Sequence, residues 1–210
     1  MDAHDIIKAY RLHVLEEGHA PASVFKFAQQ LGISEADFYQ YFASFEELER
    51  QYWKHLIDRT RNKVEEQEVY QGYTTREKLL HFYFTLFEDL MEERSFMLVL
   101  LPHDMSLENL GKGRSMAKAI RPYLEHLIDE GRTEGEVENR PVISDRYAQM
   151  LSLQWPWLVG FWLRDTSKGF EKTDTAIEKA VHVAFDLMGR NAIDSLFDFG
   201  KFMYQNGMRS

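Results

Sequence analysis

Apolar side chains recur every three or four positions along most of the chain, which is the period of an amphipathic helix. Glycines, prolines and polar capping residues divide this pattern into roughly ten segments. With only five prolines in 210 residues, long stretches are compatible with helix, and we expect an all-α fold. The expected helices cover residues 24–31, 34–42, 44–70, 75–92, 95–101, 114–130, 144–164, 173–190 and 191–205, with connections at 103–113, 131–141 and 165–172.

Two short helices joined by a tight turn occupy residues 24–42. Gly32 can adopt the positive φ that such a turn needs. Ser34, with Asp37 three residues later, is typical of a helix N-terminus. Two helices with a glycine-containing turn between them form the helix-turn-helix motif, whose second helix enters the DNA major groove. Here the second helix carries Glu35 and Asp37 and no Lys or Arg, so the fold signal and the charge signal disagree.

The N-terminal segment resembles the TetR family of one-component regulators, whose spacing it follows without a gap from residue 7 to residue 48. The residues that carry the resemblance are Ile7, Leu15, Glu17, Gly18, Ser23, Ala28, Gly32, Ile33, Ser34, Phe38, Tyr39, Tyr41, Phe42, Ser44 and Leu48. The resemblance implies a three-helix helix-turn-helix domain over residues 1–46. It also implies a helical ligand-binding and dimerisation domain over residues 47–210. The chain departs from the family at Phe45, where a Lys is usual, and at Glu35 and Asp37, where small or basic residues are usual.

Double-stranded DNA is the partner that the resemblance implies for this motif. The candidate contacts to phosphates and base edges are Ser23, Lys26, Ser34, Tyr39, Gln40 and Tyr41. Phosphate neutralisation by Lys and Arg supplies most non-specific affinity. The net charge is −9, and residues 1–60 hold six Lys and Arg against ten Asp and Glu. We therefore expect weak DNA binding with a shallow salt dependence.

Residues 75–92 are apolar on most sides, as in a helix that is buried on most sides. In a TetR-like fold this helix borders the ligand cavity. We expect the cavity to take a small apolar or lipid-like ligand, since large and adaptable apolar side chains suit flexible ligands. The alternative is that these side chains simply fill the core. The candidate lining residues are Tyr83, Phe87, Met91, Met116, Met150 and Trp157.

Segments 144–164 and 173–190 are rich in apolar and aromatic residues, and the resemblance implies a homodimer built on them. Residues 165–181 are also similar to the ubiquinone-biosynthesis lipid-binding proteins, which share the TetR-like fold. This second resemblance implies membrane contact by the segment 191–205, for which a lid on its own domain is the alternative. A lipid- or isoprenoid-binding accessory protein that has lost DNA binding is therefore the alternative to a ligand-responsive regulator.

Other functional classes find little support in the sequence. The chain has no cysteine, which excludes disulfides, thiolate chemistry and cysteine-based zinc sites. It lacks a GxSxG elbow and P-loop spacing, and its eight histidines are scattered. We expect no enzyme activity, catalytic residue, cofactor or metal. Without a signal-peptide pattern or an apolar run near 18 residues, the expected location is the cytoplasm.

Overall fold

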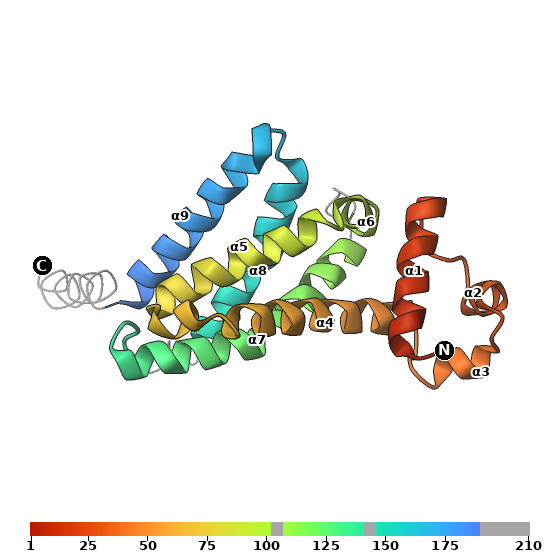
Figure 1. Cartoon of the computed structure of the whole chain (residues 1–210), viewed down its shortest axis with the longest axis horizontal. Helices are drawn as coiled ribbons and strands as arrows, with labels where there is room; N and C mark the ends of the chain where they lie inside the picture. Colours follow the sequence, from red (N-terminus) through yellow and green to blue (C-terminus); the bar gives the residue numbers. More distant parts are fainter. Residues whose placement is uncertain (102–106, 141–145, 190–210) are drawn as a thin grey trace, which may run out of the picture.

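The computed structural model describes residues 1–101, 107–140 and 146–189, and all regular structure within these ranges is helical (Figure 1). This confirms the predicted all-α class. The helices are α1 (Ala3–Glu17), α2 (Val24–Leu31), α3 (Glu35–Tyr39), α4 (Phe45–Glu65), α5 (Thr75–Met91), α6 (Arg94–Leu100), α7 (Leu107–Glu134), α8 (Tyr147–Arg164) and α9 (Glu171–Met188), with short 3-10 turns η1 (Glu68–Gly72) and η3 (Lys168–Phe170).

Helices α1 to α3 lie together at one end of the molecule (Figure 1). They pack around a cluster of aromatic rings. Phe27 from α2 and Phe38 from α3 meet edge to face, with ring centroids 6.3 Å apart. Tyr10 from α1 lies 6.1 Å from Phe27. The turn between α2 and α3 depends on Gly32, which has φ = 68°. That value strains any residue with a Cβ, so the helix-turn-helix geometry follows from glycine at this position.

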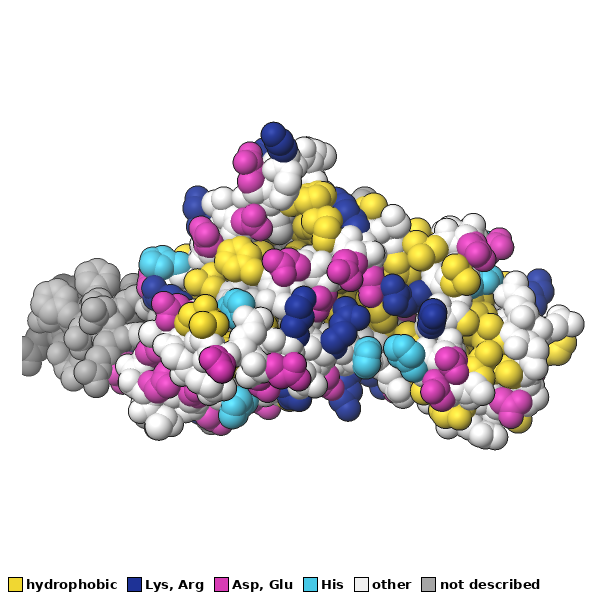
Figure 2. All heavy atoms as spheres, viewed as in Figure 1, with side chains coloured by type: hydrophobic (Ala, Val, Ile, Leu, Met, Phe, Trp, Pro, Cys, Tyr) yellow, Lys and Arg dark blue, Asp and Glu magenta, His cyan; other side chains and the backbone are white. Residues whose placement is uncertain are grey.

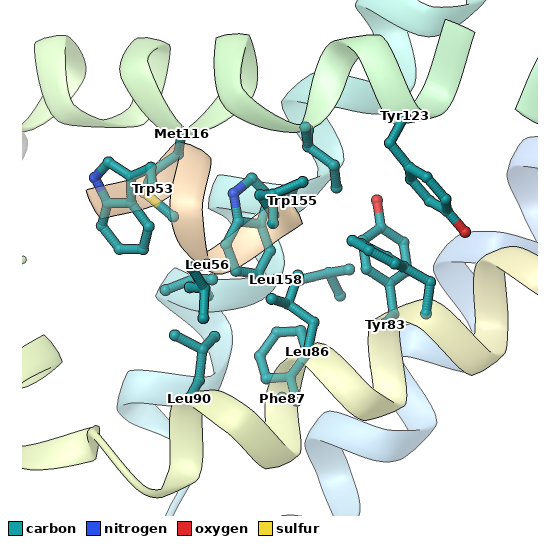
Figure 3. Packing of buried hydrophobic residues seen from close by; sticks show 14 of the residues in the cluster. Trp53, Leu56, Tyr83, Leu86, Phe87, Leu90, Met116, Tyr123, Trp155 and Leu158 are labelled. Atoms are coloured by element: carbon teal, nitrogen blue, oxygen red, sulfur yellow. The ribbon is translucent and has the colours of Figure 1, made fainter. Parts of the chain in front are cut away.

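Helix α4 runs from α1–α3 to the larger group of helices, where it lies beside α5 and α7 (Figure 1). The Ser44 hydroxyl caps its N-terminus by accepting from the Glu47 amide at 3.2 Å. Further along, Trp53 and Leu56 are buried in the core of the larger domain, where α5, α7, α8 and α9 also meet. Trp53 contacts Trp155 of α8 with ring centroids 6.4 Å apart. Figure 3 shows this core around Trp53, Trp155, Phe87 and Leu158.

The structure corrects the expected start of α7. Residues 103–113 were expected to be an irregular connection, but α7 begins at Leu107 and continues for 28 residues through Gly111, Gly113 and Pro122. Glycine disfavours helix by roughly 1 kcal/mol relative to alanine, and tertiary packing can override that preference. A Cβ added at Gly113 would lie 3.8 Å from Pro156 of α8, so this part of α7 lies close against α8.

Two further predictions concern residues 44–70 and 191–205. The expected 44–70 helix ends earlier, at Glu65, and gives way to η1. The segment 191–205 lies outside the described residues, so its expected membrane contact stays a prediction. Within the part of the chain that is described, no helix combines the length and the apolarity needed to cross a membrane.

Candidate functional site

The six residues proposed for DNA contact are all exposed, around the N-terminus of α2 and along α3. Tyr39 and Tyr41 are 52% and 40% exposed, so both hydroxyls can reach a ligand. Ser23 caps α2, and its Oγ accepts from the Lys26 amide at 3.2 Å. Gln40 immediately follows α3. The structure thus leaves all six near the helix-turn-helix surface, and their contact with DNA stays a prediction.

Ser34 and Asp37 form a complete capping box at the start of α3. The Ser34 Oγ accepts from the Asp37 amide at 3.1 Å and donates to Asp37 Oδ2 at 2.6 Å. Asp37 Oδ2 also accepts from the Ser34 amide at 2.9 Å. Hydrogen bonds from the Ser34 side chain and backbone lower the pKa of Asp37. The Ser34 hydroxyl proton is therefore already used inside the protein, which weakens its candidacy as a phosphate donor.

Phe45 stands where a Lys is usual in the TetR-like pattern, and the structure gives it a packing role. Its ring stacks on Tyr10 at 5.5 Å and lies 5.7 Å from Phe27 and 5.6 Å from Phe38. Aromatic pairs at these distances stabilise a small core. The helix-turn-helix unit therefore has an additional ring in its core and one cation fewer on its surface.

The six residues proposed for the ligand cavity do not come together. Tyr83, Phe87 and Met116 are buried in the core of the larger domain (Figure 3), whereas Met91 is 39% exposed. Met150 and Trp157 are 57% and 55% exposed on the outer side of α8. The six residues therefore do not line one cavity. Binding by the buried three stays a prediction.

The exposed side of α8 forms an apolar groove with α9. The groove measures about 880 Å³ and includes Trp157 and Leu153 from α8 and Val183 and Leu187 from α9. Leu153 and Val183 are 59% and 56% exposed. Contiguous exposed apolar surface of this kind marks an interaction site. These two helices match the segments 144–164 and 173–190 in which the dimer contact was expected.

Charged side chains of both signs gather where the helix-turn-helix meets the larger domain (Figure 2). Glu93, which lies between α5 and α6, contacts several side chains there. Its carboxylate lies 3.1 Å from Arg11 Nη2 of α1 and 3.9 Å from Arg59 Nη2 of α4. It also accepts a hydrogen bond from Tyr52 Oη. Burial, and then the nearby Glu93 charge, raise the pKa of Tyr52 well above its usual value. One carboxylate therefore connects α1, α4 and the start of α6.

Arg94, the next residue, connects α6 to the corner between α8 and α9. Its guanidinium lies 4.5 Å from the ring centroids of both Trp162 and Phe170 and donates to the carbonyls of Trp162 and Leu163. Phe170 has φ = 61°, a left-handed conformation that costs a non-glycine residue roughly 1–2 kcal/mol. Residues 93 and 94 therefore contact the helix-turn-helix domain on one side and the α8–α9 corner on the other.

Asp165 organises the turn between α8 and α9. Its Oδ1 accepts from the backbone and hydroxyl of Ser167 at 2.8 and 2.6 Å, and its Oδ2 accepts from those of Thr173 at 2.9 and 2.7 Å. Burial alone would raise the pKa of Asp165, but these hydrogen bonds outweigh it and lower the pKa to about 2. This accounts for the Asp-Thr-Ser run at 165–167 as a structural turn.

Three buried donors, Tyr83 Oη, Trp155 Nε1 and Trp162 Nε1, have no hydrogen-bond acceptor among the described residues. Tyr83 was a candidate lining residue, whereas Trp155 and Trp162 were not predicted to bind a ligand. The aromatic residues were visible in the sequence, but their burial and orientation were not. Within the described ranges, no group of three or more His, Asp or Glu side chains is placed to hold a metal ion.

The fold defines a class of all-helical proteins in which a helix-turn-helix precedes a larger group of packed helices. Residues 78–203 match the family model described as "Tetracyclin repressor-like, C-terminal domain". The chain belongs to the TetR family of transcriptional regulators, as the N-terminal resemblance predicted.

Solved structures show the same fold. One is the transcriptional regulator FadR from Bacillus subtilis in complex with stearoyl-CoA, with a TM-score of 0.59, 21% identity, and coverage of 86% of this chain and 98% of that chain. Another is the fatty acid degradation regulator FadR from Bacillus halodurans, with a TM-score of 0.57, 19% identity, and coverage of 87% and 94%. No curated protein matches the chain.

Proposed function

We propose that this TetR-family regulator is a homodimer that binds an elongated, lipid-like ligand in its larger domain and double-stranded DNA weakly through its helix-turn-helix. The observation that carries this proposal is the placement of α4. Phe45, at its start, belongs to the aromatic core of the helix-turn-helix, and Trp53, two turns later, contacts Trp155 in the larger domain. A ligand that shifts the packing of the larger domain therefore also shifts the helix-turn-helix.

A lipid-like ligand is supported by the apolar interior and by the relative from Bacillus subtilis, whose structure contains stearoyl-CoA. The core around α5 joins large rings and flexible chains, including Tyr83, Phe87, Met116 and Trp155. Lys78 is the buried cation of α5, and it pairs with Glu130 at the opposite end of that helix from Phe87. An apolar acyl chain suits such an interior better than a charged metabolite does, because burying an unpaired charge is costly.

The groove between α8 and α9 supports the homodimer. Trp157, Leu153, Val183 and Leu187 are each at least 40% exposed, which is unfavourable for a monomer in water. Two copies related by a two-fold axis would cover the same groove on each other, in an isologous contact of two helices from each subunit. Such an interface would bury more than the ~1,000 Å² expected of a specific contact.

DNA binding is tested by titrating labelled genomic fragments at 50 and 200 mM salt. We expect weak binding whose salt dependence corresponds to ~2–4 phosphates per dimer, below the ~6–10 of strong binders. Glu35→Lys should increase the affinity and steepen the salt dependence, because Glu35 is exposed on α3. Glu66→Lys makes the same charge change at the far end of α4 and serves as the control. Tight binding by the wild type with a steep salt dependence would contradict the proposal.

The alternative function is a lipid- or isoprenoid-binding accessory protein that has lost DNA binding. The specific observation in its favour is the capping box, in which the hydroxyl proton of Ser34 is held by Asp37 at 2.6 Å. Lys26 is also the one cation among the six candidate contacts. Absence of DNA binding at both salt concentrations, with lipid binding retained, would favour this alternative.

A further inference from the structure

Three buried hydrogen-bond donors lie in the apolar core of the larger domain. Tyr83 Oη, Trp155 Nε1 and Trp162 Nε1 have no acceptor among the described residues, and their side chains are at most 1% exposed. Buried polar groups are nearly always paired in native structures, and each exception needs an explanation. Three donors without acceptors in one domain indicate that something with acceptors completes the core.

The three donors belong to one seam between α5 and α8. Trp155 and Trp162 are seven residues apart, which places them on the same side of α8. The Phe87 ring lies 5.9 Å from both indole rings, and Tyr83 precedes Phe87 by one turn of α5. Figure 3 shows the Tyr83 hydroxyl and the Trp155 indole nitrogen both directed toward α7. Thus two of the donors point the same way from opposite sides of the seam.

The surroundings of the Tyr83 and Trp155 donors are apolar. Leu86, Leu158 and Met116 are nearby members of the same core and are buried (Figure 3). Burial is the one influence that raises the pKa of Tyr83, which means that no charged group acts strongly on its hydroxyl. The guanidinium of Arg94 in α6 stacks on Trp162 and donates to two backbone carbonyls. A carboxylate buried beside Tyr83 would therefore lack a counterion, whereas a neutral carbonyl would not need one.

We propose that the seam between α5 and α8, with Tyr83 and Trp155 as donors, recognises the neutral carbonyl of a long-chain acyl ester or thioester. This inference rests on the proposed lipid-responsive function and specifies the part of the ligand that the protein recognises. The hydrocarbon chain replaces apolar packing, and the carbonyl oxygen accepts from the donors that are otherwise unpaired. The helices α5 and α8 contact one another through the rings of Phe87, Trp155 and Trp162.

The decisive variant is Tyr83→Phe, which removes one hydroxyl and keeps the ring. In the ligand-free protein it should raise the melting midpoint by about 2 °C, because it removes a buried donor that has no partner. The probes are methyl oleate and 1-octadecene, two chains of similar length with and without the carbonyl. Affinity for methyl oleate, measured by displacement of a fluorescent fatty-acyl probe, should fall about five- to tenfold. Affinity for 1-octadecene should not change.

Tyr123→Phe is the matched control, since it makes the same chemical change on the neighbouring helix α7. The Tyr123 hydroxyl is paired with the Tyr70 hydroxyl at 3.1 Å, so its loss should lower the melting midpoint. The ratio of the affinities for the two probes should stay at the wild-type value.

Three results would overturn the inference. A lower melting midpoint for Tyr83→Phe would show that its hydroxyl has a partner, such as an ordered water. An unchanged ratio of the two affinities would show that the ligand carbonyl does not use this hydroxyl. Preference of the wild type for oleate over methyl oleate would show that the site takes a carboxylate. The DNA titration does not depend on these readouts. If the ligand measurements contradict carbonyl recognition, the proposed DNA-binding regulator can still be correct. If the titration shows no DNA binding, carbonyl recognition between α5 and α8 can still be correct.

Discussion

Glu93→Gln should destabilise the protein by about 2 kcal/mol, because it removes the carboxylate that three side chains share at the domain junction. In the wild type this carboxylate lies 3.1 Å from Arg11 and accepts from Tyr52 Oη. Arg59 approaches it at 3.9 Å. Glutamine has nearly the same shape, so the variant tests charge and hydrogen bonding with little change in packing.

The magnitude follows from the exposure of the partners. Removing one member of a buried ion pair typically costs ~3–5 kcal/mol, because the other charge is left uncompensated. The Glu93 side chain is 8% exposed, but Arg11 is 30% and Arg59 is 43% exposed, so water replaces part of the lost interaction. Exposed pairs contribute ~0–1 kcal/mol. The expected cost therefore lies between these two cases.

Urea unfolding at one fixed protein concentration measures this difference, since dimerisation would make the stability depend on concentration. Glu125→Gln is the control, because Glu125 pairs with Arg121 at 2.8 Å with side chains that are 51% and 44% exposed. The control should change the free energy of unfolding by less than ~0.5 kcal/mol. The reasoning is refuted if Glu93→Gln costs no more than the control.

Two further predictions concern the α8–α9 region. Asp165→Asn should flatten the loss of thermal stability between about pH 4 and pH 2. The lowered pKa of about 2 means that the ionised Asp165 stabilises the fold above the usual Asp pKa of ~3.9, and that this contribution is lost as the pH falls toward 2. Melting midpoints of both proteins across that window check the sign. Trp157→Asp should convert the proposed dimer to a monomer, because it places a charge in the apolar groove. Light scattering should then give a mass near 24.8 kDa for the variant and twice that for the wild type.

The helix boundaries that capping residues define could be predicted from the sequence. Ser34 with Asp37 and Thr74 with Glu77 both form complete capping boxes at the starts of α3 and α5. These signals are local, because side chain and amide belong to the same turn. The start of α7 could not be predicted in this way, since Gly111 and Gly113 disfavour helix locally and the packing of α7 against α8 decides the outcome.

The candidate ligand site was predicted less well for a related reason. Helical periodicity identified the apolar residues of α8, but α8 is apolar on two sides, and periodicity does not say which side faces the core. The structure buries Trp155 and Trp162 and exposes Met150 and Trp157. Only the neighbouring helices determine this choice: α5 and α7 cover one side of α8 and leave the groove with α9 open.

The two acidic residues of α3, Glu35 and Asp37, differ in their structural roles. This difference bears on how this family member would select DNA. Asp37 stabilises the helix through its bonds to Ser34 and lies at a helix N-terminus, where the dipole favours a negative charge. Glu35 also lies in the first turn of α3, where the dipole favours its charge, but unlike Asp37 it is not part of the capping box. With Lys26 as the one nearby candidate cation, attraction to phosphates is small. Selection of an operator would then depend on base contacts by residues such as Gln40 and on the distance between the two helix-turn-helix units of a dimer, which a ligand can change.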